Sequence, residues 1–204
     1  MEKTSYHHGD LRAALLEAGE RLLSETSVEN FSLRRVAKET GVSHSAPAHH
    51  FGDVSGLLTA LADEGFKRLK ASMVKFQREA GTSAEEQLIA SGRGYVRFAE
   101  ESPALFRLMF TSQRVATNGD AENTPPILAF QHLVDDVQEL WGADPSINSD
   151  AMVGLIGCWT MAHGLAELSI SGRLSSIRGS EKIDRDALFS ALFASQFPST
   201  SPSK

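Results

Sequence analysis

The sequence has little cysteine: its 204 residues contain one, Cys158. A single cysteine excludes an intrachain disulfide and any metal site built from several cysteines. This usage is typical of proteins of reducing compartments. The polar start, "MEKTSYHHGD", lacks the apolar core of a signal peptide. We therefore expect a cytoplasmic protein.

Long apolar runs are also missing. The most apolar stretch is uncharged only over residues 151–166, contains His163 and is followed by Glu167. A helix that spans a membrane needs about 20 predominantly apolar residues. We interpret this stretch as a buried helix and expect no membrane association.

Positive charge is scarce, with 20 lysines and arginines against 26 aspartates and glutamates and a net charge of -6. This balance excludes a protein that is basic over its whole surface. It leaves open a local nucleic-acid site, because affinity for phosphates depends on where the charges lie. Histidine is unevenly distributed, since five of the seven lie in the first 50 residues.

Motifs of catalysis are absent. The sequence shows no nucleophile elbow, no glycine-rich phosphate loop and no carboxylate pair with a supporting residue. A metal site is not expected either, because the adjacent His49 and His50 point about 100° apart on a helix. We predict a protein that is not an enzyme and that uses no cofactor and no metal.

Apolar residues recur at steps of three and four along the chain, without a run of strand-like alternation. This pattern predicts an all-α protein. We expect a helix-turn-helix domain over residues 1–52, a helical bundle over 53–198 and a flexible tail over 199–204. The predicted helices are 10–24, 32–40, 43–51, 53–77, 84–101, 103–112, 125–141, 149–173 and 184–197.

Two short helices in the first domain are joined by "ETGVS". Ser32 is a suitable N-cap for the first helix, and Gly41 suits its left-handed end. Ser43 is expected to cap the second helix, which places Pro47 at about its fourth position. Small residues at such a turn let the second helix cross the first steeply, as in a helix-turn-helix.

In a DNA-binding helix-turn-helix the second helix enters the major groove with its N-terminal residues at base edges. The side chains expected to read bases are Ser43, His44, Ser45, Ala46 and His49. Ser32 and Arg34 are expected to hold phosphates, and histidines, including His50, to supply donors or positive charge there. Two alternatives stay open: any helical bundle contains similar geometry, and His50 packs between helices.

The stretch "FSLRRVAKETGVSHSAPAHHFGDVSGLLTAL" resembles the DNA-binding domain of the TetR family of bacterial repressors. The residues that match the family pattern are Val36, Ala37, Lys38, Glu39, Gly41, Val42, Ser43, His50, Phe51, Leu57 and Leu58. Two positions depart from it: Ala48 replaces a usual aromatic residue, and Val54 stands where a lysine usually grips phosphate. Both departures are expected to weaken backbone contact.

The second half of the chain resembles a TetR subgroup with a Trp-x-x-x-His-Gly signature, here Trp159, His163 and Gly164. The resemblance implies a homodimer formed by the last two long helices and an enclosed inducer pocket.

The residues themselves support part of this layout. Helix 149–173 is apolar almost all round, which predicts burial by the core on one side and by a partner subunit on another. In helix 184–197, a row of residues is spaced to pair with it: Leu188, Ala191, Leu192 and Ser195. The alternative is a helix buried within one subunit.

Large apolar side chains provide candidates for binding a small-molecule effector. They are Tyr95, Phe98, Phe106, Phe110, Trp159 and His163. Aromatic residues at helical spacing are also typical of an ordinary core, and a buried histidine of a satisfied hydrogen bond, so both interpretations stay open.

The sequence thus predicts a DNA-binding transcriptional regulator, a ligand-responsive repressor that binds a near-palindromic site on double-stranded DNA as a homodimer. The alternative is a helical small-molecule-binding module with weakened or lost DNA binding.

Overall fold

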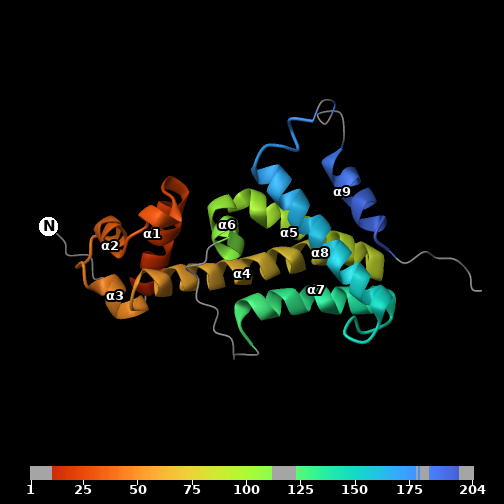
Figure 1. Ribbon diagram of the computed structural model, residues 1–204, viewed down its shortest axis with the longest axis horizontal. Coiled ribbons are helices and arrows are strands. Elements are labelled where there is room, and N and C mark those ends of the chain that lie inside the picture. The colour runs from red at the N-terminus through yellow and green to blue at the C-terminus, as the bar shows by residue number, and fades with distance from the viewer. Residues whose placement is uncertain (1–10, 112–122, 178, 180–183, 198–204) are drawn as a thin grey trace, which may run out of the picture. The chain divides into compact units, whose positions relative to one another are not determined.

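The computed structural model describes residues 11–111, 123–177, 179 and 184–197, and the regular elements in these ranges are all helices (Figure 1). The all-α prediction is confirmed. The elements are α1 Leu11–Glu25, the 3-10 turn η1 Val28–Asn30, α2 Leu33–Thr40, α3 Ala46–Phe51, α4 Val54–Arg78, α5 Ala84–Glu101, α6 Pro103–Thr111, α7 Pro125–Trp141, α8 Ser149–Ile170 and α9 Arg185–Ala194.

The chain forms two compact units, which separate within α4 at residues 65 and 66. The first contains α1, α2, α3, the start of α4 and nearly all of α6; the second contains the rest of α4 with α5, α7, α8 and α9. The sequence-based domain limit at residue 52 falls at the break between α3 and α4. The predicted tail 199–204 lies outside the described residues.

The first unit has the core that the helical spacing predicts. Leu15, Ala18 and Leu22 of α1 are fully buried, as are Val36 and Ala37 of α2. Leu57 and Leu58, in the first turn of α4, are fully buried too. These apolar contacts hold the short helices α2 and α3 in place, since helices of their length are marginal alone.

In the second unit α5 packs against α7, α8 and α9. Two glycines allow close approach to α5. A Cβ on Gly94 would lie 2.7 Å from the Met73 Cα of α4, and one on Gly92 would lie 2.2 Å from the Phe193 ring of α9. The helices that surround α5 therefore pack where its side chains are smallest.

The exposure of α8 contradicts the alternative of a helix buried within one subunit. Ala151, Leu155 and Cys158 are buried, but Val153 is 69% exposed and Ile156 is 53% exposed. One apolar face of α8 therefore lacks a partner among the residues that the structure describes. Its length and composition also pass a test for a membrane span; core helices of soluble proteins pass the same test, so this is weak evidence.

The face of α9 that is buried in the chain differs from the row of residues that was expected to pair with α8. Phe189 and Phe193 are its buried side chains, and Phe193 packs against α5 at Gly92. The predicted row is half-buried at Leu188 and Leu192 and exposed at Ala191 and Ser195. The larger phenylalanines occupy the core because they bury more apolar area.

Candidate nucleic-acid interface and ligand-binding residues

Helix α2 begins and ends as its sequence predicts. The Ser32 side chain accepts a hydrogen bond from the Arg35 backbone N–H at 3.4 Å. Gly41 adopts a left-handed φ of 70°, and the Val42 N–H donates to the Ala37 carbonyl at 3.1 Å. This last bond closes a Schellman end, which brings the chain sharply into the turn before α3.

Helix α3 starts at Ala46, so the prediction that Ser43 caps it is wrong. The Ser43 hydroxyl instead lies 3.2 Å from that of Ser45, and the Ser43 carbonyl accepts from the Ala46 N–H at 3.0 Å. These bonds form a separate turn. Pro47 is consequently at the second helical position rather than the fourth, where its missing N–H costs no helical bond.

The candidate base-reading residues lie together on this turn and α3. Ser43, His44 and Ser45 are exposed in the turn, and His49 and His50 are exposed on the helix. The two imidazole rings are 5.7 Å apart and nearly perpendicular, at 81°. The exposure of His50 contradicts the alternative that it packs between helices.

Positive side chains flank this surface. Arg34 is exposed on α2, and the Arg12 guanidinium of α1 lies 5.2 Å from the centre of the Phe51 ring at the end of α3. Sequence reasoning missed Arg12, because a cation in α1 has no local signal that places it beside α3. Its stacking on Phe51 brings one positive charge close to the helix that contains no lysine or arginine.

The candidate ligand-binding residues fall in both units. Tyr95 and Phe98 of α5 are buried in the second unit, which also contains Trp159 and His163 of α8. Phe106 and Phe110 of α6 belong to the first unit, where their ring centres are 5.0 Å apart. Only the members in the second unit form a described polar contact with one another.

That contact joins α5 and α8. The Tyr95 hydroxyl lies 2.9 Å from His163 Nδ1. Burial raises the pKa of Tyr95 above its ordinary value, a hydrogen bond with Trp159 opposes this shift, and the charge of Glu167 adds to it. Tyr95 therefore stays a neutral hydroxyl, and Trp159, which is 41% exposed, also stacks edge-on with Phe130 at 5.3 Å.

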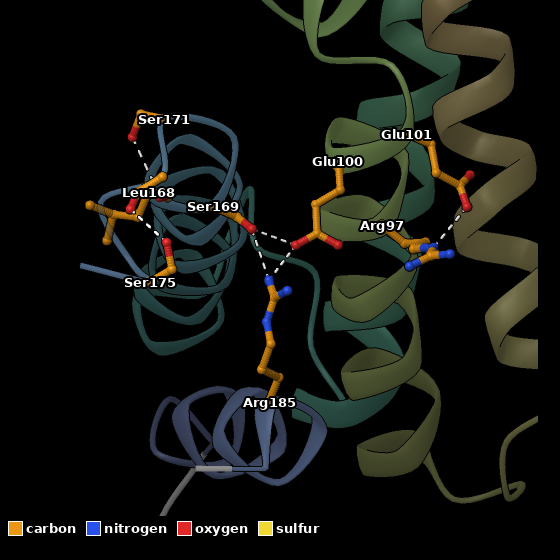
Figure 2. A network of polar contacts seen from close by, with 9 residues as sticks. Arg97, Glu100, Glu101, Leu168, Ser169, Ser171, Ser175 and Arg185 are labelled. Atoms are coloured by element: carbon orange, nitrogen blue, oxygen red, sulfur yellow. Dashed lines mark hydrogen bonds and ion pairs between the residues drawn. The ribbon is translucent and has the colours of Figure 1, made fainter. Parts of the chain in front are cut away.

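Ion pairs hold α9 to its neighbours in the second unit (Figure 2). Arg185 of α9 bonds to Glu100 of α5 and donates to the Ser169 hydroxyl of α8 at 2.8 Å. The next residue of α9, Asp186, pairs with Arg93 of α5 at 2.5 Å. The bonds fix the start of α9 against α5 and α8.

Within α5 itself, Arg97 and Glu101 form an ion pair one helical turn apart, at 2.7 Å (Figure 2). Both side chains are exposed, so the pair contributes little to stability.

Comparison with known proteins defines the class of this fold. Residues 15–61 match the family model described as bacterial regulatory proteins, tetR family, and residues 88–195 match the tetracyclin repressor-like C-terminal domain. The chain belongs to the TetR family.

Among curated proteins it is similar to the HTH-type transcriptional regulator BetI of Stenotrophomonas maltophilia, with 30% identity over 79 residues. That alignment covers 39% of this chain and 40% of BetI. The repressor AcnR of Corynebacterium glutamicum is 40% identical over 58 residues, 28% of this chain and 31% of AcnR. The chain thus spans less than half the length of either relative.

Solved structures resemble the chain over nearly its whole length. A protein with unknown function from Rhodococcus sp. RHA1 is 32% identical, with a TM-score of 0.74 and coverage of 96% of this chain and 99% of that one. The TetR family regulator PfmR from Thermus thermophilus shares the fold, with 17% identity, a TM-score of 0.64 and coverage of 92% and 98%.

Proposed function

We propose that this protein is a DNA-binding transcriptional regulator, a ligand-responsive repressor that binds a near-palindromic operator as a homodimer in the cytoplasm. The observation that supports it most is the exposure of Ser43, His44, Ser45, His49 and His50 within the residues that match the TetR family model. A regulator of this class needs no catalytic centre. Residues 1–52 are proposed as the DNA-binding domain and 53–198 as the bundle for dimerisation and effector binding.

In this proposal the turn before α3 reads base edges. Ser43, His44, Ser45 and Ala46 come first to the major groove, with His49 and His50 one helical turn further. Ser32 and Arg34 position the unit on phosphates, as polar and basic groups do in most DNA complexes. The exposed Arg12 beside Phe51 adds a cation that partly replaces the lysine missing at Val54.

The dimer is proposed to form through α8 and α9. The exposed apolar side chains on one side of α8 are Met152, Val153, Ile156 and Trp159. Their spacing places them within about 120° of the helix circumference, and exposed apolar patches mark interaction sites in soluble proteins. The outward row of α9, from Leu188 to Ser195, would extend the same interface.

The effector is proposed to bind in the second unit near the Tyr95, Trp159 and His163 contact, with Phe98 as apolar lining. Phe106 and Phe110 stay candidate ligand-binding residues of the first unit. The support for the Trp-x-x-x-His-Gly subgroup is that Trp159 and His163 both interact with Tyr95. An effector changes DNA affinity only by its different affinity for the DNA-binding and the released conformation.

One observation favours a second candidate, an effector-binding module with weakened DNA binding. Helix α3 contains no lysine or arginine, and Ala48 is exposed where the family usually has an aromatic residue. Fewer phosphate contacts lower affinity for any DNA sequence.

The test is titration of the protein onto the DNA upstream of its own coding region and onto a random duplex of equal length, at two salt concentrations. We expect tighter binding to the upstream DNA, with loss in Arg34→Ala and His44→Ala. The salt slope should fall by about 0.9 for each phosphate contact removed. Arg21→Ala is the matched control, because Arg21 is exposed in the same unit and pairs with Glu17 outside the helix-turn-helix. Equal binding to both duplexes by all variants would favour the second candidate.

A further inference from the structure

Two residues, Gly52 and Asp53, separate α3 from α4 in the first unit. Gly52 has φ 76° and ψ -76°, and the Asp53 N–H donates to the Phe51 carbonyl at 3.0 Å. A hydrogen bond between residues two positions apart, with these angles at the residue between them, defines a γ-turn. A positive φ combined with a ψ outside the left-handed helical region is open to glycine and not to residues with a Cβ. The chain therefore leaves α3 at a sharply defined angle that depends on Gly52.

A second glycine faces this turn from the first turn of α4. A Cβ on Gly56 would overlap the Phe51 carbonyl oxygen, which is the acceptor of the γ-turn. The overlap would involve a backbone atom, so rotation of a side chain does not relieve it. The Gly56 N–H donates to Asp53 Oδ1 at 2.8 Å, and Asp53 thereby caps α4. Gly52, Asp53 and Gly56 together form the joint between α3 and α4.

The packing of α3 itself gives it little hold on the first unit. Pro47 is the one buried side chain among its six residues, all of which the structure describes, and Phe51 is half-buried. The start of α4, in contrast, is fixed by Leu57 and Leu58, which are fully buried directly after Gly56. Because a helix of six residues is marginal alone, one with so little buried surface takes its orientation from its two ends. The end that leads to α4 is the γ-turn that packs against Gly56.

We propose that Gly52 and Gly56 are positioning residues for DNA recognition, because they set the angle between α3 and α4 and so place the exposed side chains of residues 43–50 at the groove. This inference rests on the proposed function. Side chains that recognise a ligand must be held to within about 0.5 Å of their productive positions. Base contacts provide sequence preference, whereas phosphate contacts strengthen binding to any duplex. A change at the joint therefore acts on sequence preference rather than on general affinity.

The first test compares the wild type with two joint variants, Gly56→Ala and Gly52→Ala. Each full-length chain is titrated onto the DNA upstream of its coding region and onto a random duplex. Gly56→Ala disturbs the joint through overlap, and Gly52→Ala through backbone angles alone, since a Cβ on Gly52 meets nothing within 4 Å among the described residues. We expect each to lower the preference for the upstream DNA by about tenfold, the scale of one lost base contact, with binding to the random duplex unchanged.

Gly19→Ala is the matched control, the same substitution in the core of the same unit. Its Cβ would lie 3.1 Å from Leu61 Cδ1, and it leaves the joint intact. This variant should keep the wild-type preference for the upstream DNA. Circular dichroism and urea denaturation check that each variant is folded under the conditions of the titration. If one of the two joint variants does not fold, the other decides.

A second measurement follows the position of α3 without DNA. Nitroxide labels are attached to Ala48→Cys on α3 and to Glu25→Cys at the end of α1, which are both exposed positions, in a background with the buried Cys158 replaced by alanine. Double electron–electron resonance measures the distance between the labels, and an excess of unlabelled protein removes distances between subunits. We expect the joint variants to shift or broaden this distance and Gly19→Ala to keep it.

The proposal is overturned if the joint variants keep the wild-type label distance, or if Gly19→Ala changes it as much. It is also overturned if the distance changes while the preference for the upstream DNA does not. A wild type that binds both duplexes equally would contradict the proposed function, and the label distance would still decide whether the two glycines position α3.

Discussion

The two units of this protein place their polar side chains in opposite environments. In the first unit Ser43, His44, Ser45, His49 and His50 are exposed on a turn and a short helix. In the second the notable polar groups are enclosed between helices: Tyr95 is buried and Asp136 is 11% exposed. An exposed row of polar groups suits a large external partner such as DNA, whereas enclosed groups can contact only their neighbours in the fold or a small ligand.

The largest expected effect is on dimerisation. It shows whether the apolar face of α8 stays exposed, as α3 does, or becomes buried between two subunits. Val153→Asp should place an unpaired charge in the proposed interface and weaken dimerisation by about a hundredfold or more. Analytical ultracentrifugation measures the association, with Val153→Ala as the matched control that keeps the position apolar. A dimer of unchanged stability in Val153→Asp would place the interface elsewhere.

The next effect concerns how tightly the second unit packs around α5. Gly94→Ala adds a Cβ 2.7 Å from the Met73 Cα, and a backbone atom of this kind moves only with its helix. We expect a loss of about 1–3 kcal/mol in the free energy of unfolding. Chemical denaturation measures it. Gly164→Ala is the comparison, since its Cβ meets nothing within 4 Å among the described residues. Equal stability of Gly94→Ala and wild type would contradict the close approach of α4 and α5.

The two units also differ in how far the sequence predicts them. Ser32, Gly41 and the exposed histidines lie within 19 residues of one another, so local capping rules and spacing are enough to place them. The prediction that Ser43 caps α3 is wrong, because its hydroxyl lies against that of Ser45 rather than against a backbone N–H of the helix. Helical spacing also predicts α5 and α7, whose bounds agree with the structure.

In the second unit, the contacts that matter join distant positions. Tyr95 meets His163 across 68 residues, and Gln77 meets Asp136 across 59. No local pattern specifies such pairs, because they depend on which helices pack and at what rotation. The contact of Asp136 with Gln77 was therefore missed, since the local sequence shows merely two adjacent acids, Asp135 and Asp136, on a largely apolar helix.

A smaller effect tests the burial of Asp136. Burial raises its pKa, although His132, Ser91 and Gln77 oppose the shift. The folded state therefore holds this proton more tightly than the unfolded state, so stability falls as pH rises from the ordinary aspartate range to the raised pKa and stays lower above it.

Asp136→Asn removes this penalty. It should raise the free energy of unfolding at pH 7 by on the order of 1 kcal/mol, with the gain disappearing below about pH 4. Urea denaturation at several pH values measures it, and Asp135→Asn should show no such pH-dependent gain. If Asp136→Asn is less stable than wild type at pH 7, the contacts of the carboxylate with its neighbours outweigh the cost of burying its charge.

The smallest expected effect concerns the exposed histidines of the first unit. His49 and His50 are exposed on a helix without lysine or arginine, so any positive charge near phosphates must come from imidazolium or from neighbours such as Arg12. Histidine is the side chain whose charge ordinarily changes between pH 5 and 8. Affinity for operator DNA should therefore be about threefold higher at pH 6 than at pH 8, the scale of an exposed ion pair. Fluorescence anisotropy at fixed salt measures this affinity. The double variant His49→Ala, His50→Ala should lose the pH dependence, while Arg34→Ala should keep it.

If the double variant keeps the full dependence, His44 in the preceding turn becomes the group to replace next, because it is the remaining exposed histidine of the same surface.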